Sequence, residues 1–192
     1  MLQQKTIGAV LFDGFETLDV YGPLGLLVSA AFGNPYTAIL ISPPTPKSPN
    51  IVLTSSKLQT VAEHTLQYPP AQKYDILLIP GGLGNRPLLQ DRAYLELLRK
   101  NAEFVLQNGG KILCVCTGSL LLAATGLLDG KIATTNKKVY STLTPNYATV
   151  KWKKEARWVV DGEIITSSGI SAGMVGLHSC TAANGRMQHY IF

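Results

Sequence analysis

Charged residues are scarce in this sequence. Asp, Glu, Lys and Arg make up 15% of the 192 residues, whereas hydrophobic residues make up 46%. A disordered chain has the opposite balance, so this composition indicates a globular protein. No run of about 18 apolar residues is uninterrupted, and the first residues lack the layout of a signal peptide. We therefore expect a globular chain that does not span a membrane.

Cysteine and dense basic runs are also rare. Cys114, Cys116 and Cys180 form neither a disulfide framework nor the paired spacing of a zinc site. This cysteine usage favours a reducing, cytoplasmic setting. The net charge of +5 is spread along the chain, with its densest patches at 137–138 and 151–154. A nucleic-acid surface needs a longer basic stripe, so we expect solvated faces and no nucleic-acid binding.

Two common phosphate-binding patterns are incomplete. Gly82 and Gly84 lack the third glycine of a dinucleotide fingerprint, because Pro87 occupies that position. No glycine-rich loop ends in Gly-Lys-Ser or Gly-Lys-Thr. Both patterns are thereby excluded.

The chain does contain apolar strands that alternate with helices. Strands are expected at 6–12, 36–41, 75–79 and 111–115, and helices at 24–32, 92–106 and from 119 onward. The other expected elements are a hairpin or an edge excursion at 51–61, a helical turn at 137–143, a hairpin at 158–166, and a loop at 168–173 before a last helix. This alternation predicts right-handed crossovers and a parallel sheet with helices on both faces. The expected fold is a single α/β domain of the flavodoxin-like or Rossmann-like kind.

The segment 111–124 joins a strand directly to a helix. Lys111–Val115 has the composition of a strand, and good helix formers follow from Ser119. Cys116 lies between them with no room for a loop, which is the layout of a nucleophile elbow. Because a helix N-terminus favours negative charge, we expect Cys116 to be largely ionised near neutral pH, about two units below its usual pKa of about 8.5. Alternatively, Cys116 is a small buried hydrophobic residue at the end of a core strand.

Three segments are expected to meet at one edge of the sheet. Asp19, the turn 81–83 and Cys116 each follow a predicted strand, and ligands of parallel sheets bind beyond the carboxyl ends of the strands. Burial beside Cys116 would raise the pKa of Asp19 and make it a proton carrier. Alternatively, Asp19 only stabilises the start of its helix, and Glu16 is the competing carboxylate.

Gly82 and Leu83 lie in the turn that follows the strand expected at 75–79. Their backbone N–H groups are candidates for stabilising developing negative charge. A tight turn without a role in binding explains the same pattern.

Several motifs resemble the ThiJ/PfpI family of the glutamine-amidotransferase-like superfamily. The matching segments are 18–23 (LDVYGP), 79–84 (IPGGLG), 115–119 (VCTGS), 126–135 (GLLDGKIATT) and 168–173 (SGISAG). Within this family the chain is most similar to the isonitrile hydratases, which pair a Leu-Asp-x-x-Gly-Pro helix start with a Cys-Thr-Gly elbow. The resemblance implies a homodimer that uses neither a metal ion nor an organic cofactor.

The resemblance also implies roles for individual residues. Cys116 is expected to be the nucleophile, Asp19 the acid and base, Thr117 a supporting hydroxyl, and Gly82 and Leu83 the oxyanion-type donors. The expected substrate-binding residues also include Gly118, Glu16 and Ile170. In the implied reaction the Cys116 sulfur attacks the terminal carbon of an isonitrile, a thioimidate forms, and water releases an N-substituted formamide.

Two features depart from the family pattern. Thr117 and Asn136 stand where relatives often carry histidine, so a Cys-His protease triad is not expected. After residue 174 the family continues into a long apolar helix, whereas 175–192 contains Gly176, Gly185 and several polar residues. We therefore expect an α/β domain at 1–174 and an atypical tail at 175–192.

Three hypotheses about function remain from the sequence. The first is a cysteine-dependent hydratase of small isonitriles, which Thr117 favours. The second is a glyoxalase- or deglycase-like activity on small aldehydes that uses the same Cys116. The third is a redox-sensing or inactive binding protein in which Cys116 is oxidised, which the atypical tail favours.

Overall fold

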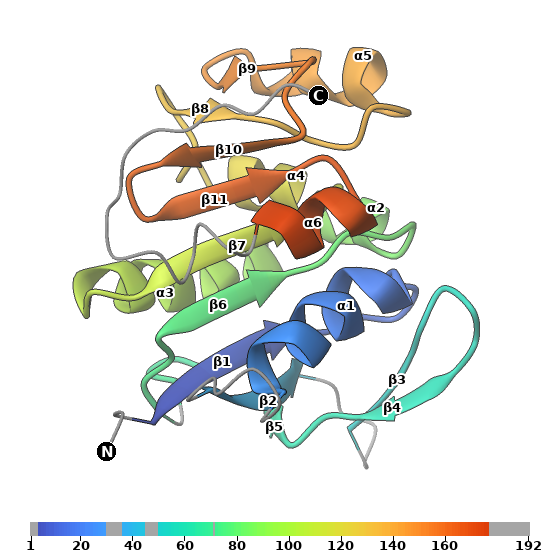
Figure 1. The fold of residues 1–192 in the computed structure, drawn as a ribbon, viewed down its shortest axis with the longest axis vertical. Helices are drawn as coiled ribbons and strands as arrows, with labels where there is room; N and C mark the ends of the chain where they lie inside the picture. The colour runs from blue at the N-terminus through green and yellow to red at the C-terminus, as the bar shows by residue number, and fades with distance from the viewer. Residues whose placement is uncertain (1–3, 30–35, 45–49, 71, 177–192) are drawn as a thin grey trace.

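A seven-stranded sheet forms the centre of the computed structural model, which describes residues 4–29, 36–44, 50–70 and 72–176 (Figure 1). The strands are β1 (Lys5–Val10), β2 (Tyr36–Ser42), β3 (Ile51–Leu53), β4 (Gln59–Val61), β5 (His64–Thr65), β6 (Ile76–Ile79), β7 (Lys111–Val115), β8 (Ile132–Ala133), β9 (Lys151–Trp152), β10 (Trp158–Asp161) and β11 (Ile164–Ser167). The helices are α1 (Thr17–Val28), α2 (Asn85–Leu88), α3 (Arg92–Gln107), α4 (Gly118–Ala124), α5 (Tyr140–Leu143), the 3-10 helix η2 (Thr144–Tyr147) and α6 (Ile170–Gly176).

The order of strands in the central sheet is β10-β11-β7-β6-β1-β2-β5. All neighbours are parallel except β10 and β11, which form an antiparallel hairpin at one edge. Every residue of β6 is buried, as expected for a strand that is covered on both faces. The predicted flavodoxin-like α/β class is therefore confirmed, with the predicted hairpin at 158–166 as its antiparallel edge.

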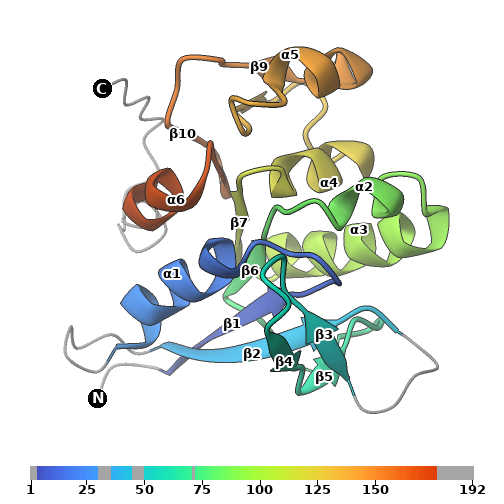
Figure 2. The same cartoon turned by 90° about the vertical axis from the view of Figure 1, so that its right-hand side faces the viewer.

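Helices cover both faces of this sheet (Figure 2). α1 and α6 pack against one face, and α2, α3 and α4 lie on the other. α3 is amphipathic and buries Leu98, Ala102 and Val105, while the Asp91 side chain accepts a hydrogen bond from the Tyr94 N–H and caps its start. The sequence pattern predicted helices on both faces of the sheet, and the structure has them.

The boundaries of two helices differ from the sequence-based expectation. α1 begins at Thr17 rather than at residue 24, and Pro23 lies inside it. α6 begins at Ile170, within the segment expected to be a loop. The short α6 covers β7 and β11, and its Gly173 packs against Val115, where a Cβ would lie 2.8 Å from the side chain. The predicted atypical tail lies outside the described residues beyond Gly176.

The central strands bring three connections to one edge of the sheet. β6 pairs with β1 on one side and with β7 on the other, all in parallel. The segments that follow these strands, 11–16, 80–84 and 116–117, therefore emerge next to one another. Their proximity places the candidate site.

Gly118 provides the first test of this arrangement. A Cβ at this position would clash with the Ile79 carbonyl oxygen and would lie 2.8 Å from that of Pro80. We expect Gly118→Ala to lower the free energy of unfolding by about 1–3 kcal/mol, because α4 must move away from the end of β6. Gln107→Ala, at an exposed position of α3, should change it by less than about 0.5 kcal/mol in the same urea titration. Equal stability of both variants would contradict the packing described.

Candidate active site

Cys116 lies on a sharp turn between β7 and α4. Its φ angle is +57°, in the left-handed region that residues with a Cβ rarely adopt. Such a conformation costs on the order of 1–2 kcal/mol. Thr117 follows with φ −78° and ψ 1°, and α4 begins at the next residue. The strained turn has the geometry of the predicted nucleophile elbow.

The backbone of Cys116 is held by three other segments. Its N–H donates to the Ser167 carbonyl oxygen at 3.0 Å, at the end of β11. Its carbonyl oxygen accepts from the Ser119 hydroxyl at 3.2 Å and from the Thr135 hydroxyl at 3.1 Å. These bonds fix the strained turn and hence the direction of the side chain.

Gly81 lets the turn after β6 approach this elbow. A Cβ at Gly81 would lie 2.6 Å from the Thr117 nitrogen and 2.8 Å from the Cys116 Cβ. No larger residue fits there without separating the two segments. The Gly81 N–H donates to Asp19 Oδ2 at 3.0 Å, so the same turn also holds the carboxyl group.

Asp19 is fully buried in the first turn of α1. Its second oxygen, Oδ1, has no hydrogen-bond partner. Burial raises the pKa of Asp19 from 3.8 to about 7, and the charge of Glu16 contributes, whereas hydrogen bonds with Gly81 and Cys116 lower it. A carboxyl group with this pKa can accept and release a proton near neutral pH.

The expected ionisation of Cys116 at rest is wrong. Burial, followed by the charge of Asp19, raises the pKa of Cys116 to about 12. Hydrogen bonds from Thr117 and Asn136 lower that pKa, but they do not outweigh the other two effects. The helix N-terminus therefore does not produce a resting thiolate, and Cys116 and Asp19 form a coupled pair in which the thiol keeps its proton near neutral pH.

Thr117 connects the elbow to the turn after β6. Its Oγ1 accepts a hydrogen bond from the Gly82 N–H at 3.2 Å, and its carbonyl oxygen accepts from Asn85 Nδ2 at 3.0 Å. The Gly82 N–H, expected to face a ligand, is thus engaged with Thr117. Within the described part of the chain no hydrogen bond involves the Leu83 N–H, so that group is the better candidate donor.

A cleft of about 490 Å³ opens beside Cys116. Its lining residues are Glu16, Ser55, Gly82, Leu83, Asn85, Arg86, Cys116, Thr117, Asn136, Lys138, Val139 and Leu143. Of the residues expected to bind substrate, Gly118 and Ile170 do not line this cleft. Gly118 is buried behind the elbow, and Ile170 is the half-buried first residue of α6.

Glu16 also lines the cleft, but its carboxylate has another partner. Glu16 Oε2 accepts from the Ser55 hydroxyl at 3.0 Å, which ties the start of α1 to the β3–β4 hairpin. Its backbone N–H donates to the Gly81 carbonyl oxygen at 2.8 Å. The competing carboxylate therefore contributes charge to Asp19 and shape to the cleft.

The sequence assigned no role to two asparagines of this cleft. Asn136 Nδ2 donates to Cys116 Sγ at 3.1 Å, and Asn85 holds the Thr117 carbonyl as described above. Each follows a turn or a short buried strand, as the predicted site residues do. That position in the fold was one sequence signal that pointed to them. For Asn136 there was a second, since relatives often carry histidine at its position.

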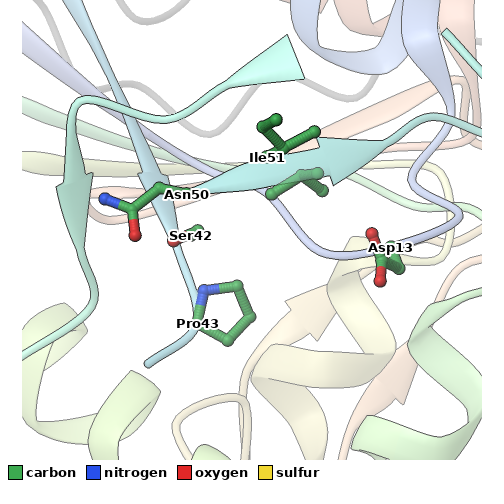
Figure 3. Close-up of a pocket in the computed structure, with 6 residues that line it drawn as sticks. Asp13, Ser42, Pro43, Asn50 and Ile51 are labelled. Atoms are coloured by element: carbon green, nitrogen blue, oxygen red, sulfur yellow. The ribbon is translucent and has the colours of Figure 1, made fainter. Parts of the chain in front are cut away.

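Two other cavities of the described chain, of about 420 Å³ beside Leu89 and about 390 Å³ beside Leu95, have no cysteine or histidine among their lining residues. Within the described residues, no group of three or more His, Cys, Asp or Glu residues could hold a metal ion, and no helix is long and apolar enough to cross a membrane. A separate cavity of about 70 Å³ lies between the ends of β2 and β3, near Ser42, Asn50 and Asp13 (Figure 3). Its size suits ordered water rather than a substrate.

The raised pKa of Asp19 predicts a pH dependence of stability. Because the folded-state pKa is about 7 and the ordinary value is 3.8, the unfolded chain loses this proton first as pH rises. The free energy of unfolding should fall relative to that of Asp19→Asn between about pH 4 and 7, by at most about 1.4 kcal/mol per pH unit. Urea titrations across this range measure it.

The variant Asp19→Asn retains an oxygen for the Gly81 N–H, so it isolates the ionisation. Glu16→Gln should shorten the pH interval of this fall, since the Glu16 charge raises the pKa of Asp19. A difference between the parent and Asp19→Asn that does not vary with pH would contradict the assignment.

Comparisons with known proteins agree on one family. Residues 5–175 match the model described as the DJ-1/PfpI family. The chain is 34% identical to isonitrile hydratase of Pseudomonas putida over 168 residues, which cover 88% of this chain and 67% of the hydratase. It is 29% identical to the protein dj-1beta of Drosophila melanogaster over 118 residues, which cover 62% of this chain and 60% of that protein.

Solved structures have the same fold. A ThiJ/PfpI family protein from Pseudomonas syringae superposes with a TM-score of 0.73 at 26% identity, over 92% of this chain and 67% of that one. DJ-1beta of Drosophila melanogaster gives a TM-score of 0.73 at 22% identity, over 91% of this chain and 87% of that one. The fold, the strained cysteine turn and the match over most of its length together place this chain in the DJ-1/PfpI family.

Proposed function

We propose that this protein is a cysteine-dependent hydratase that converts small isonitriles to N-substituted formamides. The observation that carries the proposal is the buried pair of Cys116 and Asp19, in which the pKa of the carboxyl group is about 7. The similarity to isonitrile hydratase of Pseudomonas putida supports this substrate class.

The proposed reaction begins with proton transfer from the Cys116 thiol to the Asp19 carboxylate. The sulfur then attacks the terminal carbon of R–N≡C, and the same carbon receives the proton from Asp19, which gives the thioimidate R–N=CH–S-Cys116. Water adds to this carbon while Asp19 accepts one of its protons and delivers that proton to the nitrogen, which gives R–NH–CH(OH)–S-Cys116. The C–S bond then breaks as the hydroxyl proton passes to Asp19 and from there to the sulfur, and R–NH–CHO leaves.

The cleft suits a small substrate with an apolar R group. Its lining includes the apolar residues Leu83, Val139 and Leu143. The Leu83 N–H is our candidate donor to negative charge that develops on the substrate.

The two alternative functions use the same sulfur. No histidine lines the cleft, and His64, the one histidine within the described residues, lies in β5 at the sheet edge. An aldehyde-directed activity would therefore also depend on Asp19 for proton transfer. Because Cys116 is only half-buried, oxidation of its sulfur is the alternative to turnover.

We further propose that the protein is a homodimer that pairs through α1. Apart from the buried Asp19, α1 carries no charged residue. Leu18, Tyr21, Gly25 and Val28 follow one side of the helix at spacings of three and four, and the three larger side chains are 50%, 39% and 37% exposed. An exposed apolar stripe of this kind favours burial against a partner, and a two-fold axis brings the same stripe from a second copy.

Turnover of cyclohexyl isocyanide tests the hydratase proposal. We expect the parent to produce the formamide, Cys116→Ala to produce none, and Asp19→Asn to lose about 10²–10⁴-fold in rate, as is typical when an acid–base group is removed. Glu16→Gln should retain most of the activity, because that carboxylate bonds to Ser55. Formamide production can be followed by chromatography.

A folded parent without turnover would rule out the hydratase function. Full activity of Asp19→Asn would instead move the proton transfer to Glu16 or to water. If the folded parent does not turn over the isocyanide, methylglyoxal is the next substrate to test.

The dimer is tested by Gly25→Arg. A Cβ at Gly25 meets nothing within 4 Å in one protomer, so the folded protomer tolerates the change. Light scattering coupled to size exclusion should give a dimeric parent and a monomeric variant. Gln107→Arg, at an exposed site on α3, should remain dimeric, and a Gly25→Arg variant that dimerises like the parent would exclude α1 as the interface.

A further inference from the structure

Asn136 contacts the reacting atom of the candidate site. Its Nδ2 lies 3.1 Å from Cys116 Sγ, within hydrogen-bond distance for a sulfur acceptor. Asn136 is half-buried and lines the cleft, on the segment that follows β8. It therefore approaches the sulfur from a different part of the chain than Asp19 does.

The orientation of this amide is fixed by its other end. Asn136 Oδ1 accepts a hydrogen bond from the Lys138 N–H at 3.0 Å. If the amide were reversed, its NH₂ group would face this N–H, donor against donor, and its oxygen would face the electron-rich sulfur. The arrangement that satisfies both ends directs the N–H groups to Cys116.

The segment that carries Asn136 is itself anchored. The Thr134 N–H donates to the Thr166 hydroxyl at 2.9 Å, and the Thr135 hydroxyl donates to the Cys116 carbonyl oxygen at 3.1 Å. Lys137 Nζ donates to the Ala156 carbonyl oxygen at 2.6 Å. These bonds hold the segment of Asn136 in place relative to both β11 and the elbow. The amide therefore contacts the sulfur from a fixed position.

The charges around the sulfur make such a donor useful. Asp19 approaches from the start of α1 and disfavours a negative sulfur, whereas Glu16 and the exposed Arg86 and Lys138 line the cleft. A neutral amide donates at every pH and does not compete for the proton that Cys116 and Asp19 share. It lowers the free energy of the thiolate without removing the base.

We propose that Asn136 is a catalytic residue, whose amide donates a hydrogen bond to Cys116 Sγ and stabilises the thiolate once its proton has moved to Asp19. In the forward direction the sulfur's electron pair then enters the C–S bond, and the negative charge leaves the sulfur. When the C–S bond breaks, the pair returns to the sulfur and meets the same N–H group. Only the part that Asn136 plays in turnover rests on the proposed hydratase function.

The test measures alkylation of Cys116 by iodoacetamide, followed residue by residue by mass spectrometry. Because only the thiolate reacts, the rate at neutral pH reports its stability. We expect Asn136→Ala to react about tenfold more slowly than the parent, which corresponds to about 1.4 kcal/mol. Asn136→Asp should react more slowly still, since it places a negative oxygen against the sulfur.

The pair of variants separates this role from a structural one. Asn136→Asp keeps the oxygen that accepts from the Lys138 N–H, so a purely structural role predicts that Asp is milder than Ala. The proposal would be overturned if Cys116 were alkylated in Asn136→Asp as fast as in Asn136→Ala, or faster. It would also be overturned if both variants were alkylated at the rate of the parent. Asn108→Asp, at the exposed end of α3, is the control and should react like the parent.

The two proposals can fail separately, because alkylation needs no isonitrile. If the alkylation rates follow the expected order and the parent does not turn over isonitriles, the hydratase function fails and the thiolate-stabilising role of Asn136 stands. If isonitriles are turned over and Asn136→Asp is alkylated like the parent, the role of Asn136 fails alone.

Discussion

The site depends on placing two acids, Cys116 and Asp19, in one buried volume. In water each would ionise independently, but here burial penalises both negative forms, the charge of Asp19 raises the pKa of Cys116, and the charge of Glu16 raises that of Asp19. The pair therefore holds its protons to higher pH than either group would in solution. The partial positive charge at the N-terminus of α4, a helix of seven residues, does not reverse this effect. The thiolate then forms when a proton moves from Cys116 to Asp19 rather than to solvent. The hydrogen-bond donors around the sulfur therefore determine how stable that thiolate is.

The fold creates this pair through the adjacency of β1, β6 and β7. Three connections must converge within a few ångströms, and backbone atoms without side chains make this possible at Gly81 and Gly118. The Gly81 N–H then holds Asp19, and the Thr117 hydroxyl holds the Gly82 N–H. Packing and polar contacts thus use the same few residues, so a change to the packing at the strand ends also changes the chemistry.

Much of this could be predicted from the sequence. The alternation of apolar strands and helices predicted the parallel sheet, and the strand–Cys116–helix layout predicted the turn at which Cys116 adopts a positive φ. Asp19 was expected near Cys116 because both follow central strands. Local patterns suffice for these features, because each depends on a periodicity or on a short motif.

Other features depend on contacts that no local pattern encodes. The resting protonation of Cys116 follows from burial and from a carboxylate far away in the chain, and its direction was predicted wrongly. The bond from Gly82 to Thr117 and the amide of Asn136 likewise join segments that are distant in sequence. Helix boundaries were also missed, because Pro23 was expected to precede α1 and lies within it.

The positive φ of Cys116 has a consequence for how this protein can change over evolutionary time. Glycine adopts that conformation without strain, so loss of the side chain at this position would make the folded chain more stable. Replacing the buried Asp19, whose Oδ1 has no hydrogen-bond partner, by a neutral residue would do the same at neutral pH. Mutational drift in a chain without a use for its sulfur would therefore tend to remove both residues. Keeping both residues therefore lowers the stability of the fold at this point, and selection for stability alone would not retain them.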